Sequence, residues 1–502
     1  MEVVIILPNQ LFEDNKMINQ KTQVYLYEHP VNFTLYKYHK LKLILHRSSM
    51  KSYQDYLEKT YRCHVTYIEF HQDLNKIVKK YKNKQIDIYD PVDFHIITDL
   101  KKVCKKYQIE LFVHDSPLFL LPIADLQNYL DQGGKYHQTS FYIWQRKKLN
   151  ILVDKNEKPI GGKWTFDKDN RLPFPKTGIK DQIFKVNLSK YVVEGKKYIE
   201  KYFKDNPGST DLYLEIDHQG AKKHLQQFLK ERLNCFGPYQ DAVSKNIIFG
   251  CHTVLSPMTN IGLLTHKYIV DEVLKYYAKN KNKINFASVE GLIRQIVGWA
   301  SFTRLVYMFR HKELISNNHF NHKRKIGKSW YTGETGIEPI DDLIKKVLKY
   351  GYLHHIERLM YIGNFMLLCE FDPMEVNRWF MSLCALDSYH VFMDTNVNGM
   401  SQYASANLFT TRPYFSASNY ISKMSDYKKV VNKYKKIVIN GQNYEWYEIW
   451  DALYYNFVNN HKKEFSKNYS LANTVSQWNK KSNSEKSKLL EIAKKFLQYG
   501  AT

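Results

Sequence analysis

Residues 1–8, with the sequence MEVVIILP, place five apolar side chains between an acidic residue and a proline. A short run of branched apolar residues with a turn residue behind it is typical of a buried β-strand. The run lacks the basic start of a signal peptide, and no stretch of eighteen or more apolar residues occurs in the chain. The sequence therefore predicts a first strand over Val3–Leu7 and an intracellular, soluble protein with no membrane span.

Further apolar runs follow this strand and alternate with helical patterns. The expected strands are Gln23–Tyr27, Cys63–Glu69, Gln85–Tyr89 and Ile109–Val113, and the expected helices are Ser49–Tyr61, Asp73–Tyr81 and Ile96–Tyr107. Alternation of this kind predicts a mostly parallel, doubly wound sheet. No G-x-G-x-x-G sequence follows the first strand, so the dinucleotide fingerprint is missing. Any ligand of this sheet would lie at the carboxyl ends of its strands.

The rest of the chain divides into a connector and a helical half. Between Leu121 and Asp217 the periodicity weakens, and Pro159–Trp164 is rich in turn residues, which indicates a connector over the surface. After Ala221 helical periodicity continues to the end of the chain. We expect an α/β domain over residues 1–125, a connector over 126–220 and an all-helical domain over 221–502.

The 502-residue chain carries a formal net charge of +24. An excess of that size favours a polyanionic partner, because each neutralised phosphate releases counterions. A composition rich in Lys, Asn and Tyr through A/T-rich codons explains the charge equally well, so both interpretations stay open. The six cysteines form no C-x-x-C pair and lie among apolar residues, which favours free buried thiols over a disulfide framework or a zinc site.

Three segments of the helical half combine polar and aromatic residues as a binding site does. His252–Asn260 places hydroxyls before a proline-initiated helix, where they could hold a phosphate or simply cap the helix. Tyr352–Met360 contains His354 and His355, which on a helix point about 100° apart and so do not suit one metal ion. Residues 387–425 mix aromatics, amides and single charges, as a pocket for a planar ring or a packed irregular loop does.

A helix start is marked by Asp372, Pro373 and Glu375. Aspartate is a preferred N-cap residue, proline suits the first helical position, and a glutamate three residues after the cap completes a capping box. The pattern predicts a helix that begins at Pro373 and carries Trp379.

Taken together and in order, these segments resemble the cryptochrome/photolyase family. Within it they are most similar to the bacterial iron–sulfur branch of (6-4) photolyases, the deoxyribodipyrimidine photolyase-related proteins, and the likeness covers nearly the whole chain. The residues that carry it are Asn9–Leu11, Gly161–Trp164, Asn170–Arg171, Phe236–Ala242, Leu255–Pro257, Ile293–Trp299, His354–Ile356, Gly399–Gln402, Pro413–Tyr414 and Ile421–Tyr427.

The resemblance implies an antenna-type α/β domain and a helical domain that holds FAD in a folded, U-shaped form. His354 and His355 would be the catalytic residues, between the flavin and the lesion. The other residues implied are Thr253, Leu255 and Ser256 at the FAD phosphates; Gln295, Asp387, Tyr389 and Met393 or Asp394 at the flavin; Trp379, Trp330 and Tyr331 in an electron relay; and Arg171, Met400 and Tyr414 in the lesion pocket.

The same resemblance implies a monomeric DNA photolyase, a light-driven carbon–carbon lyase that acts on UV-damaged DNA. Excited, reduced flavin would donate an electron to a flipped-out pyrimidine dimer. A (6-4) lesion also needs a proton, which a protonated histidine can supply, so the two histidines favour (6-4) photoproducts. Three alternatives stay open: a cyclobutane pyrimidine dimer photolyase, a cryptochrome-like blue-light receptor without repair activity, and a nucleic-acid-binding protein without a cofactor.

The chain departs from the iron–sulfur branch at the positions of the cluster. That branch carries cysteines in four places; here the first falls near Glu338–Pro339, and Lys428–Val431 follows Tyr427 without a cysteine. Thiolates hold such clusters, so we predict that no iron–sulfur cluster is bound and that Tyr427–Asn443 replaces it by packing. The few matching N-terminal residues leave the antenna chromophore, a lumazine type or another, undetermined.

Overall fold

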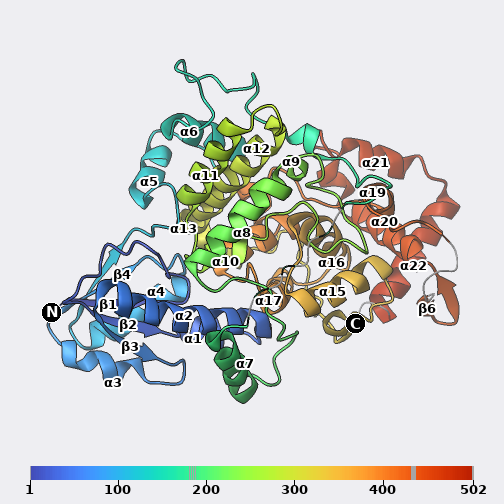
Figure 1. Ribbon diagram of the computed structural model, residues 1–502. Helices are drawn as coiled ribbons and strands as arrows, with labels where there is room; N and C mark the ends of the chain where they lie inside the picture. The colour runs from blue at the N-terminus through green and yellow to red at the C-terminus, as the bar shows by residue number, and fades with distance from the viewer. Residues whose placement is uncertain are drawn as a thin grey trace.

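A computed structural model of the chain describes residues 2–430 and 437–499, apart from Lys180, Gln182, Ile183, Lys185 and Asn187. The N-terminal part, drawn in blue, combines a sheet with helices, and the green-to-red remainder is a mass of helices beside it (Figure 1). This two-part architecture confirms the fold class that the sequence predicts.

The described sheet has five parallel strands in the order β3-β2-β1-β4-β5. They are β1 (Val3–Ile6), β2 (Gln23–Tyr27), β3 (His64–Ile68), β4 (Gln85–Tyr89) and β5 (Glu110–His114). The chain winds from β1 outward to β3, returns to the centre at β4 and ends at β5, which is the doubly wound order that alternating strands and helices predict.

Helices cover both faces of the sheet and explain why β1 is apolar throughout. Helices α1 (Pro30–Phe33), α2 (Lys40–Tyr61), α3 (Leu74–Val78) and α4 (Phe94–Lys106) belong to this part. Val4 and Ile6 join one apolar cluster with residues of α2, whereas Val3 and Ile5 join another with residues of α4. A parallel strand that is buried on both sides has no solvent face and needs no polar alternation.

Helix α2 begins nine residues earlier than the sequence pattern predicts. His39 caps it by accepting a hydrogen bond from the Leu41 backbone N–H at 3.0 Å. Its first turns contain the buried polar residues Lys42, His46 and Arg47, which break the amphipathic pattern. Lys42 donates to the Ser388 carbonyl oxygen at 2.5 Å, so these turns are helical because they contact the other half of the molecule.

The connector is more ordered than its weak periodicity indicates. It contains α5 (Ile123–Asp131), α6 (Gln138–Lys148) and α7 (Lys190–Tyr202). Helix α7 packs along α2, and a Cβ on Gly195 would stand 2.6 Å from the Ser48 hydroxyl oxygen. The close approach shows that the two helices pack tightly against each other.

The helical half builds up around one long, continuous helix. Helix α12 (Phe286–Ile293) passes through a π-helical segment, Arg294–Ala300, into α13 (Ser301–Ser316), so the expected buried helix over Gly291–Phe309 is present. The other helices are α8 (His218–Glu231), α9 (Leu233–Phe236), α10 (Ser256–Asn260), α11 (His266–Lys279), α14 (Ser329–Thr332), α15 (Glu338–Tyr350), α16 (Asn364–Leu368), α17 (Pro373–Leu383), α18 (His390–Met393), α19 (Ser418–Met424), α20 (Trp446–Phe465), α21 (Ala472–Asn479) and α22 (Asn483–Tyr499).

Shorter elements complete the helical half. Further π-helical segments span Glu357–Gly363 and Asp394–Ser401, and short 3₁₀ turns span Lys79–Tyr81, Asp167–Asn170 and Ala406–Leu408. An antiparallel hairpin joins β6 (Ile437–Ile439) to β7 (Gln442–Tyr444). Residues 431–436, within the segment expected to replace a cluster, lie outside the described residues.

The start of α17 corrects one detail. Asp372 caps the helix by accepting from the Met374 backbone N–H at 2.8 Å, as predicted. The capping box is wrong, because the Asp372 backbone N–H donates to the Arg324 carbonyl oxygen at 2.9 Å. The carboxylate of Glu375 instead pairs with Lys325 at 3.1 Å.

The cysteine expectation is also wrong for one pair. Cys235, in α9, and Cys251, ahead of α10, form a disulfide with their Cα atoms 5.7 Å apart. The folding of the intervening loop brings them together, which their sequence spacing does not reveal. Cys63, Cys104, Cys369 and Cys384 are free and buried, as expected.

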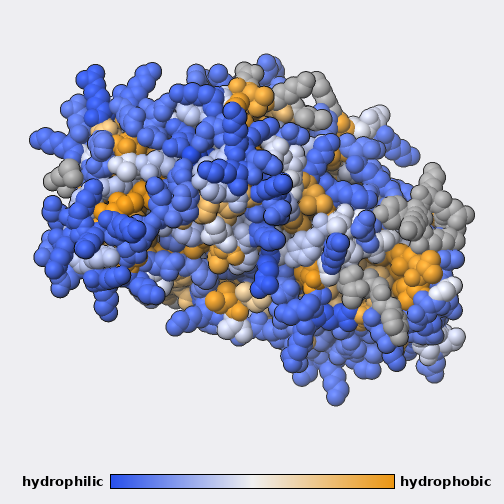
Figure 2. Space-filling view, turned by 90° about the horizontal axis from the view of Figure 1, so that it is seen from below, coloured by the Kyte–Doolittle hydropathy of each residue, from blue (hydrophilic) through white to orange (hydrophobic). Residues whose placement is uncertain are grey.

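The two halves share apolar packing. One buried cluster joins Val4 and Leu26 of the sheet to Leu225 of α8 and Val297 of the long helix. The face drawn in Figure 2 is largely hydrophilic, with small and separate apolar areas. Among the described residues, no helix combines the length and apolar character needed to cross a bilayer.

Candidate functional site

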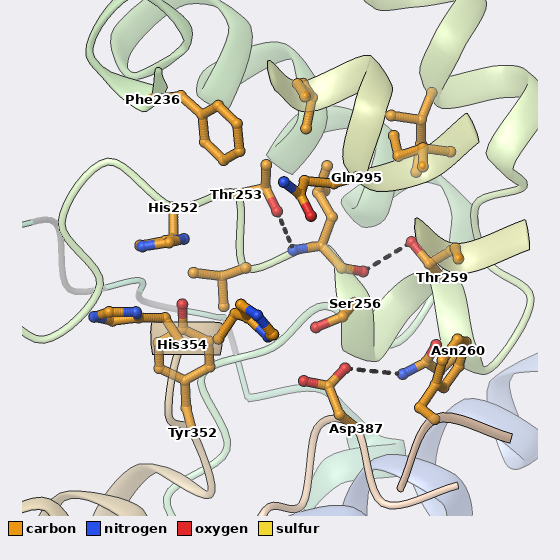
Figure 3. Close-up of a pocket in the computed structure, with 18 of the residues that line it drawn as sticks. Phe236, His252, Thr253, Ser256, Thr259, Asn260, Gln295, Tyr352, His354 and Asp387 are labelled. Carbon is orange, nitrogen blue, oxygen red and sulfur yellow. Dashed lines mark hydrogen bonds between the residues drawn. The ribbon is translucent and has the colours of Figure 1, made fainter. Parts of the chain in front are cut away.

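A cavity opens in the helical half between α10, the long helix and the loops before α16 and α18. The volume of the cavity is about 240 Å³, and the open mouth adds further space. Among its lining residues are seven site residues predicted from the sequence, namely Thr253, Leu255, Ser256, Gln295, His354, His355 and Asp387. Figure 3 shows Ser256 near Asp387, Gln295 near Thr253, and His252 beside His354.

The loop ahead of α10 forms one wall of the cavity. Val254 has a φ of 53°, a conformation that a β-branched residue rarely adopts. The Thr253 hydroxyl accepts from the Leu255 backbone N–H at 3.2 Å, and the Thr259 hydroxyl donates to the Leu255 carbonyl oxygen at 2.9 Å. These bonds hold the strained turn so that the side chain of Ser256 reaches the cavity (Figure 3).

An ion pair forms the opposite wall. The Arg358 guanidinium lies 3.2 Å from the Asp387 carboxylate, and the Asn260 amide donates to the other oxygen of Asp387 at 3.2 Å. Arg358 comes from the π-helical segment Glu357–Gly363, where the wider turn carries it to the cavity. A carboxylate held between a cation and an amide is a fixed acceptor for a ligand N–H.

Stacked histidines form the third wall. The rings of His252 and His354 lie 4.4 Å apart, with their planes at 16°. His354 precedes the helix and His355 is its first residue, so the two are not paired on a regular helix as the sequence pattern predicts. Burial, together with the charge of Arg358, lowers the pKa of His355 to about 4. Burial also lowers the pKa of His354 well below 6.5, with Lys346 as the next cause.

Several polar atoms of these walls have no hydrogen-bond partner among the described residues although they are buried. They are His252 Nε2, His354 Nδ1, Gln240 Oε1, His266 Nδ1 and Arg358 Nε. Buried polar groups in native proteins are nearly always satisfied, so unpartnered donors and acceptors around one cavity fit a polar ligand. Apolar residues such as Leu292, Ile296 and Phe392 line the rest of the cavity and suit a planar ring.

The chain is similar to known photolyases. The sequence profile of the family described as deoxyribodipyrimidine photo-lyase-related protein matches residues 4–213. A (6-4) photolyase of Agrobacterium fabrum is 27% identical over 473 residues, which cover 92% of this chain and 91% of that protein. The chain is thus similar to a (6-4) photolyase over nearly its whole length, and its residues 4–213 match the photolyase-related family.

Solved structures of photolyases and cryptochromes share the fold. A class III photolyase from Agrobacterium tumefaciens matches with a TM-score of 0.56 at 14% identity, over 83% of this chain and 82% of that one. The Synechocystis sp. PCC6803 cryptochrome matches with a TM-score of 0.55 at 15% identity, over 83% and 84%. An archaeal photolyase from Sulfolobus tokodaii, solved with two FAD molecules, matches with a TM-score of 0.51 at 14% identity, over 82% and 85%.

Tyr389 and Met393 lie next to the cavity but not in its lining. The Tyr389 hydroxyl bonds His46 Nε2 at 2.8 Å, and the ring borders a smaller cavity between the sheet and the helices. Met393 borders another small cavity, which it shares with His355 and Arg358. Asp394, the alternative to Met393, lies 3.0 Å from both His311 and Asn377 and is occupied by these contacts.

The residues predicted for the electron relay are in contact with one another. Trp379 and Trp330 are both buried, and the Trp379 indole N–H donates to the Trp330 carbonyl oxygen at 2.8 Å. Tyr331 follows Trp330 and is partly exposed. The ring of Phe380, 5.0 Å from that of Trp379, borders the small cavity of Met393, so Trp379 lies one ring away from that cavity and the relay stays a prediction.

The residues predicted for the lesion pocket are more scattered. Met400 is buried in an apolar cluster, and Tyr414 packs against that cluster. Arg171 is largely exposed and pairs with Asp167, which also lies 3.2 Å from Arg294. None of the three predicted residues is part of the main cavity lining, so their role stays a prediction.

Sequence reasoning missed several residues of the site although it quoted the motifs that contain them. His252, Asn260 and Arg358 line the cavity. His252 directly precedes the assigned Thr253, whereas Asn260 and Arg358 follow the assigned Ser256 and His355 by four and three residues. Asp241 lies near Arg171, and burial together with Asp167 raises its pKa to about 6. Only contacts between distant segments distinguish these residues from their neighbours, so no local signal could have selected them.

The region expected to replace an iron–sulfur cluster is closely packed where it is described. Lys245 pairs with Glu338 and lies 4.7 Å from the ring centre of the buried Tyr427. The backbone N–H of Lys245 donates to Asp426 at 3.0 Å. Among the residues that the structure describes, no three His, Cys, Asp or Glu side chains are grouped as metal ligands. The absence of a cluster stays a prediction.

Proposed function

We propose that this protein repairs UV-damaged DNA by light-driven electron transfer from bound FAD, and that (6-4) photoproducts are its preferred lesion. The observation that carries the proposal is the single cavity that gathers residues from the segments around 253, 295, 354 and 387. These segments are far apart in the chain, and the family resemblance assigns all of them to the flavin or the lesion.

The residues of the cavity suit the parts of FAD. The hydroxyl of Ser256 and the turn at Thr253 would hold the diphosphate, with Arg358 as a positive charge in the same cavity lining. Asp387 would accept a hydrogen bond from the ring system, because Arg358 and Asn260 fix its carboxylate. Reduced FAD, once excited by light, would supply the electron. The protein would bind the cofactor and the lesion, orient them and exclude water.

Proton delivery is the step that separates the lesion classes. His355 lines both the main cavity and the Met393 cavity, each time together with Arg358. A lesion and its phosphates would add negative charge near His355, and such a charge favours the protonated ring that a (6-4) lesion needs. His354 would fix the backbone of its own loop. Its backbone N–H donates to the Glu357 carboxylate at 3.0 Å, and that carboxylate pairs with Lys346 at 2.7 Å.

Cyclobutane pyrimidine dimer repair is the second candidate, and the low pKa of His355 favours it. With a pKa of about 4, His355 is neutral near pH 7 in the ligand-free site. Cyclobutane dimers need only an electron, so a neutral histidine does not hinder their repair.

An antenna chromophore would occupy the carboxyl ends of the strands. The smaller cavity there lies between the sheet and the helices and is bordered by Asn9, Asn32 and Tyr389. Asn9 Oδ1 and Asn32 Nδ2 are buried and have no partner among the described residues. These amides suit the polar edge of a lumazine-type or similar ring. The absorption spectrum of the purified protein would identify the chromophore.

The test uses purified protein and oligonucleotides that each contain one defined lesion. A yellow protein with a flavin spectrum is expected, and after reduction it should restore (6-4) photoproducts under blue light. His355→Ala should abolish (6-4) repair while its flavin content stays at the wild-type level. Cyclobutane repair alone would establish the second candidate. Flavin photoreduction without repair of either lesion would indicate a cryptochrome-like receptor, and a colourless protein that takes up no FAD would refute all three.

A further inference from the structure

An aromatic chain continues beyond the predicted relay and reaches the surface through α20. The Trp330 ring lies 6.1 Å from Phe365, and Phe365 lies 4.7 Å from Trp450. Trp450 lies 6.0 Å from Trp446, whose ring is 5.8 Å from that of Tyr447. All these distances join ring centres and fall in the range of direct aromatic contact. The rings therefore form a continuous path from Trp330 to Tyr447, and the hydrogen bond from the Trp379 indole to the Trp330 carbonyl oxygen joins Trp379 to its inner end.

The inner members of the chain are shielded from water. Trp379, Trp330 and Trp450 are no more than 1% exposed, and Trp446 is 4% exposed. Trp450 is fixed because its indole N–H donates to the Ser416 carbonyl oxygen at 3.0 Å. Tyr447, at the end of the chain, is partly exposed. A buried row of oxidisable indoles that ends in a solvent-accessible phenol has the arrangement of a hole-transfer path.

We propose that Trp450, Trp446 and Tyr447 are electron-transfer residues, and that they carry the oxidising equivalent from the flavin site to the surface. The proposal rests on the proposed function, because the flavin is the oxidant at the inner end. The oxidising equivalent would then have two routes to the surface, one through α20 and one through Tyr331, which follows Trp330 in the chain.

The electrons balance over the whole path. Trp379 gives one electron to the light-excited oxidised flavin, and Trp330 then gives one to Trp379. Phe365, which is not oxidised, bridges the gap across which Trp450 reduces Trp330, and Trp446 in turn reduces Trp450. Tyr447 reduces Trp446, loses its phenolic proton to water and becomes a neutral radical. A soluble thiol returns one electron and one proton to Tyr447 and becomes a thiyl radical, and two thiyl radicals from two such events combine as a disulfide.

The position of Tyr447 suits its role as the final donor. Its proton must leave when the electron does, and an exposed phenol can release the proton directly to solvent. The Lys429 ammonium lies 5.9 Å from the ring centre. A positive charge there disfavours the radical cation of Tyr447 and favours the neutral radical that remains after deprotonation.

The first experiment measures flavin photoreduction by blue light with a thiol present. Trp450→Phe and Trp446→Phe keep an aromatic ring but remove an oxidisable indole, so both should photoreduce several-fold more slowly than the wild type. Trp478→Phe is the matched control. Trp478 is 3% exposed and stacks on Tyr455 in the same helical layer, outside the chain of contacts. Wild-type rates in both Trp450→Phe and Trp446→Phe would overturn the proposal.

The second experiment needs no flavin and is independent of the proposed function. Azide radicals oxidise tryptophan in the FAD-free protein, and the tryptophan radical signal should convert to a tyrosyl signal. Tyr447→Phe should remove most of that conversion, whereas Tyr331→Phe should leave it. The reverse result would assign the exit to Tyr331 and overturn the α20 path. A protein that binds no FAD but passes this test would refute the proposed function alone.

Discussion

The imidazole rings of His252 and His354 stack at 4.4 Å in the cavity wall, and burial lowers the pKa of both well below 6.5. His354 also opposes a charge on His252, because it is the second cause of the lowered pKa of His252. The pair is therefore neutral in the folded protein near pH 7, and protonation of either ring must disrupt the stack.

This stack predicts how stability depends on pH. Below pH 6.5 the unfolded chain takes up protons that the folded chain refuses, so the free energy of unfolding falls as the pH decreases towards the lowered pKa values. His252→Phe keeps a flat ring and removes one titrating group. Between about pH 7 and about pH 5, the slope of its unfolding free energy against pH should therefore be smaller than that of the wild type, by an amount that corresponds to at most one proton. Urea unfolding at a series of pH values measures both slopes.

The control lies within the same data set. At about pH 8 both rings are neutral in either state, so His252→Phe should unfold close to the wild-type urea concentration. Equal slopes for variant and wild type below pH 6.5 would mean that His252 accepts its proton without leaving the stack.

The ion pair between Arg358 and Asp387 supports a second prediction. Asp387→Ala removes the partner of Arg358 and the acceptor of the Asn260 amide, which should lower the free energy of unfolding by about 2 kcal/mol. The affinity for FAD should fall as well, because the same carboxylate faces the cavity. Asp271→Ala is the control: its exposed pair with Lys267 contributes at most about 0.5 kcal/mol. Equal effects in the two variants would show that Asp387 is an ordinary surface carboxylate.

A third prediction concerns the contact between the sheet and the helices. His390 Nδ1 bonds the Asp93 carboxylate at 2.8 Å, and both residues are buried. Burial opposes the charge on His390, but Asp93 outweighs it and the pKa of His390 is raised above 6.5. The stabilisation from this histidine is thus complete at or below pH 6.5 and is lost as the pH rises through the raised pKa.

His390→Phe should therefore cost most at moderately acid pH. Removing one member of a buried pair costs about 3 kcal/mol, and this deficit should shrink at alkaline pH, where wild-type His390 is neutral. Urea unfolding of wild type and variant at about pH 6 and about pH 9 measures the difference. A deficit that stays constant over this interval would mean that the ring contributes by packing and not by its charge.

The sequence predicts the sheet well because local signals define its strands. Short apolar runs with turn residues between them mark Val3–Leu7 and Gln85–Tyr89, and the structure places strands there. Helix α7 was missed; it packs on α2, where Gly195 approaches Ser48, which lies 147 residues away. Propensity is a weak guide wherever such tertiary contacts decide the fold.

In the candidate site, too, the sequence predicts some residues and misses the partners that contact them. Motif order selects Thr253, Gln295 and Asp387, which the structure brings to one cavity. The partners that fix these residues, such as Arg358 for Asp387, belong to other segments and emerge only from three-dimensional contacts. The disulfide between Cys235 and Cys251 escaped prediction for the same reason.

A fourth prediction tests the absence of an iron–sulfur cluster. Tyr427 is buried and packs near Lys245, at the place where the resemblance puts cluster ligands. Protein purified without oxygen should contain no iron by elemental analysis. Tyr427→Ala should instead lower the free energy of unfolding by about 3 kcal/mol, as the loss of a buried aromatic ring does. Stoichiometric iron, or a Tyr427→Ala variant as stable as the wild type, would contradict the prediction that packing replaces the cluster.

The fifth prediction concerns the disulfide beside the cavity. Cys251 is bonded to Cys235 and directly precedes His252 and Thr253, so the bond tethers the loop that forms one cavity wall. Unfolding the protein without a reductant should expose four thiols, and reduction should raise the number to all six. Replacing both bonded cysteines by alanine should cost about 3 kcal/mol, because the open loop gains conformational entropy on unfolding. The variant should also bind FAD more weakly, since the turn at Val254 keeps its strained φ of 53° only while its surroundings hold it. Six reactive thiols in the unreduced protein would contradict the bond and return both cysteines to the free state that the sequence suggests.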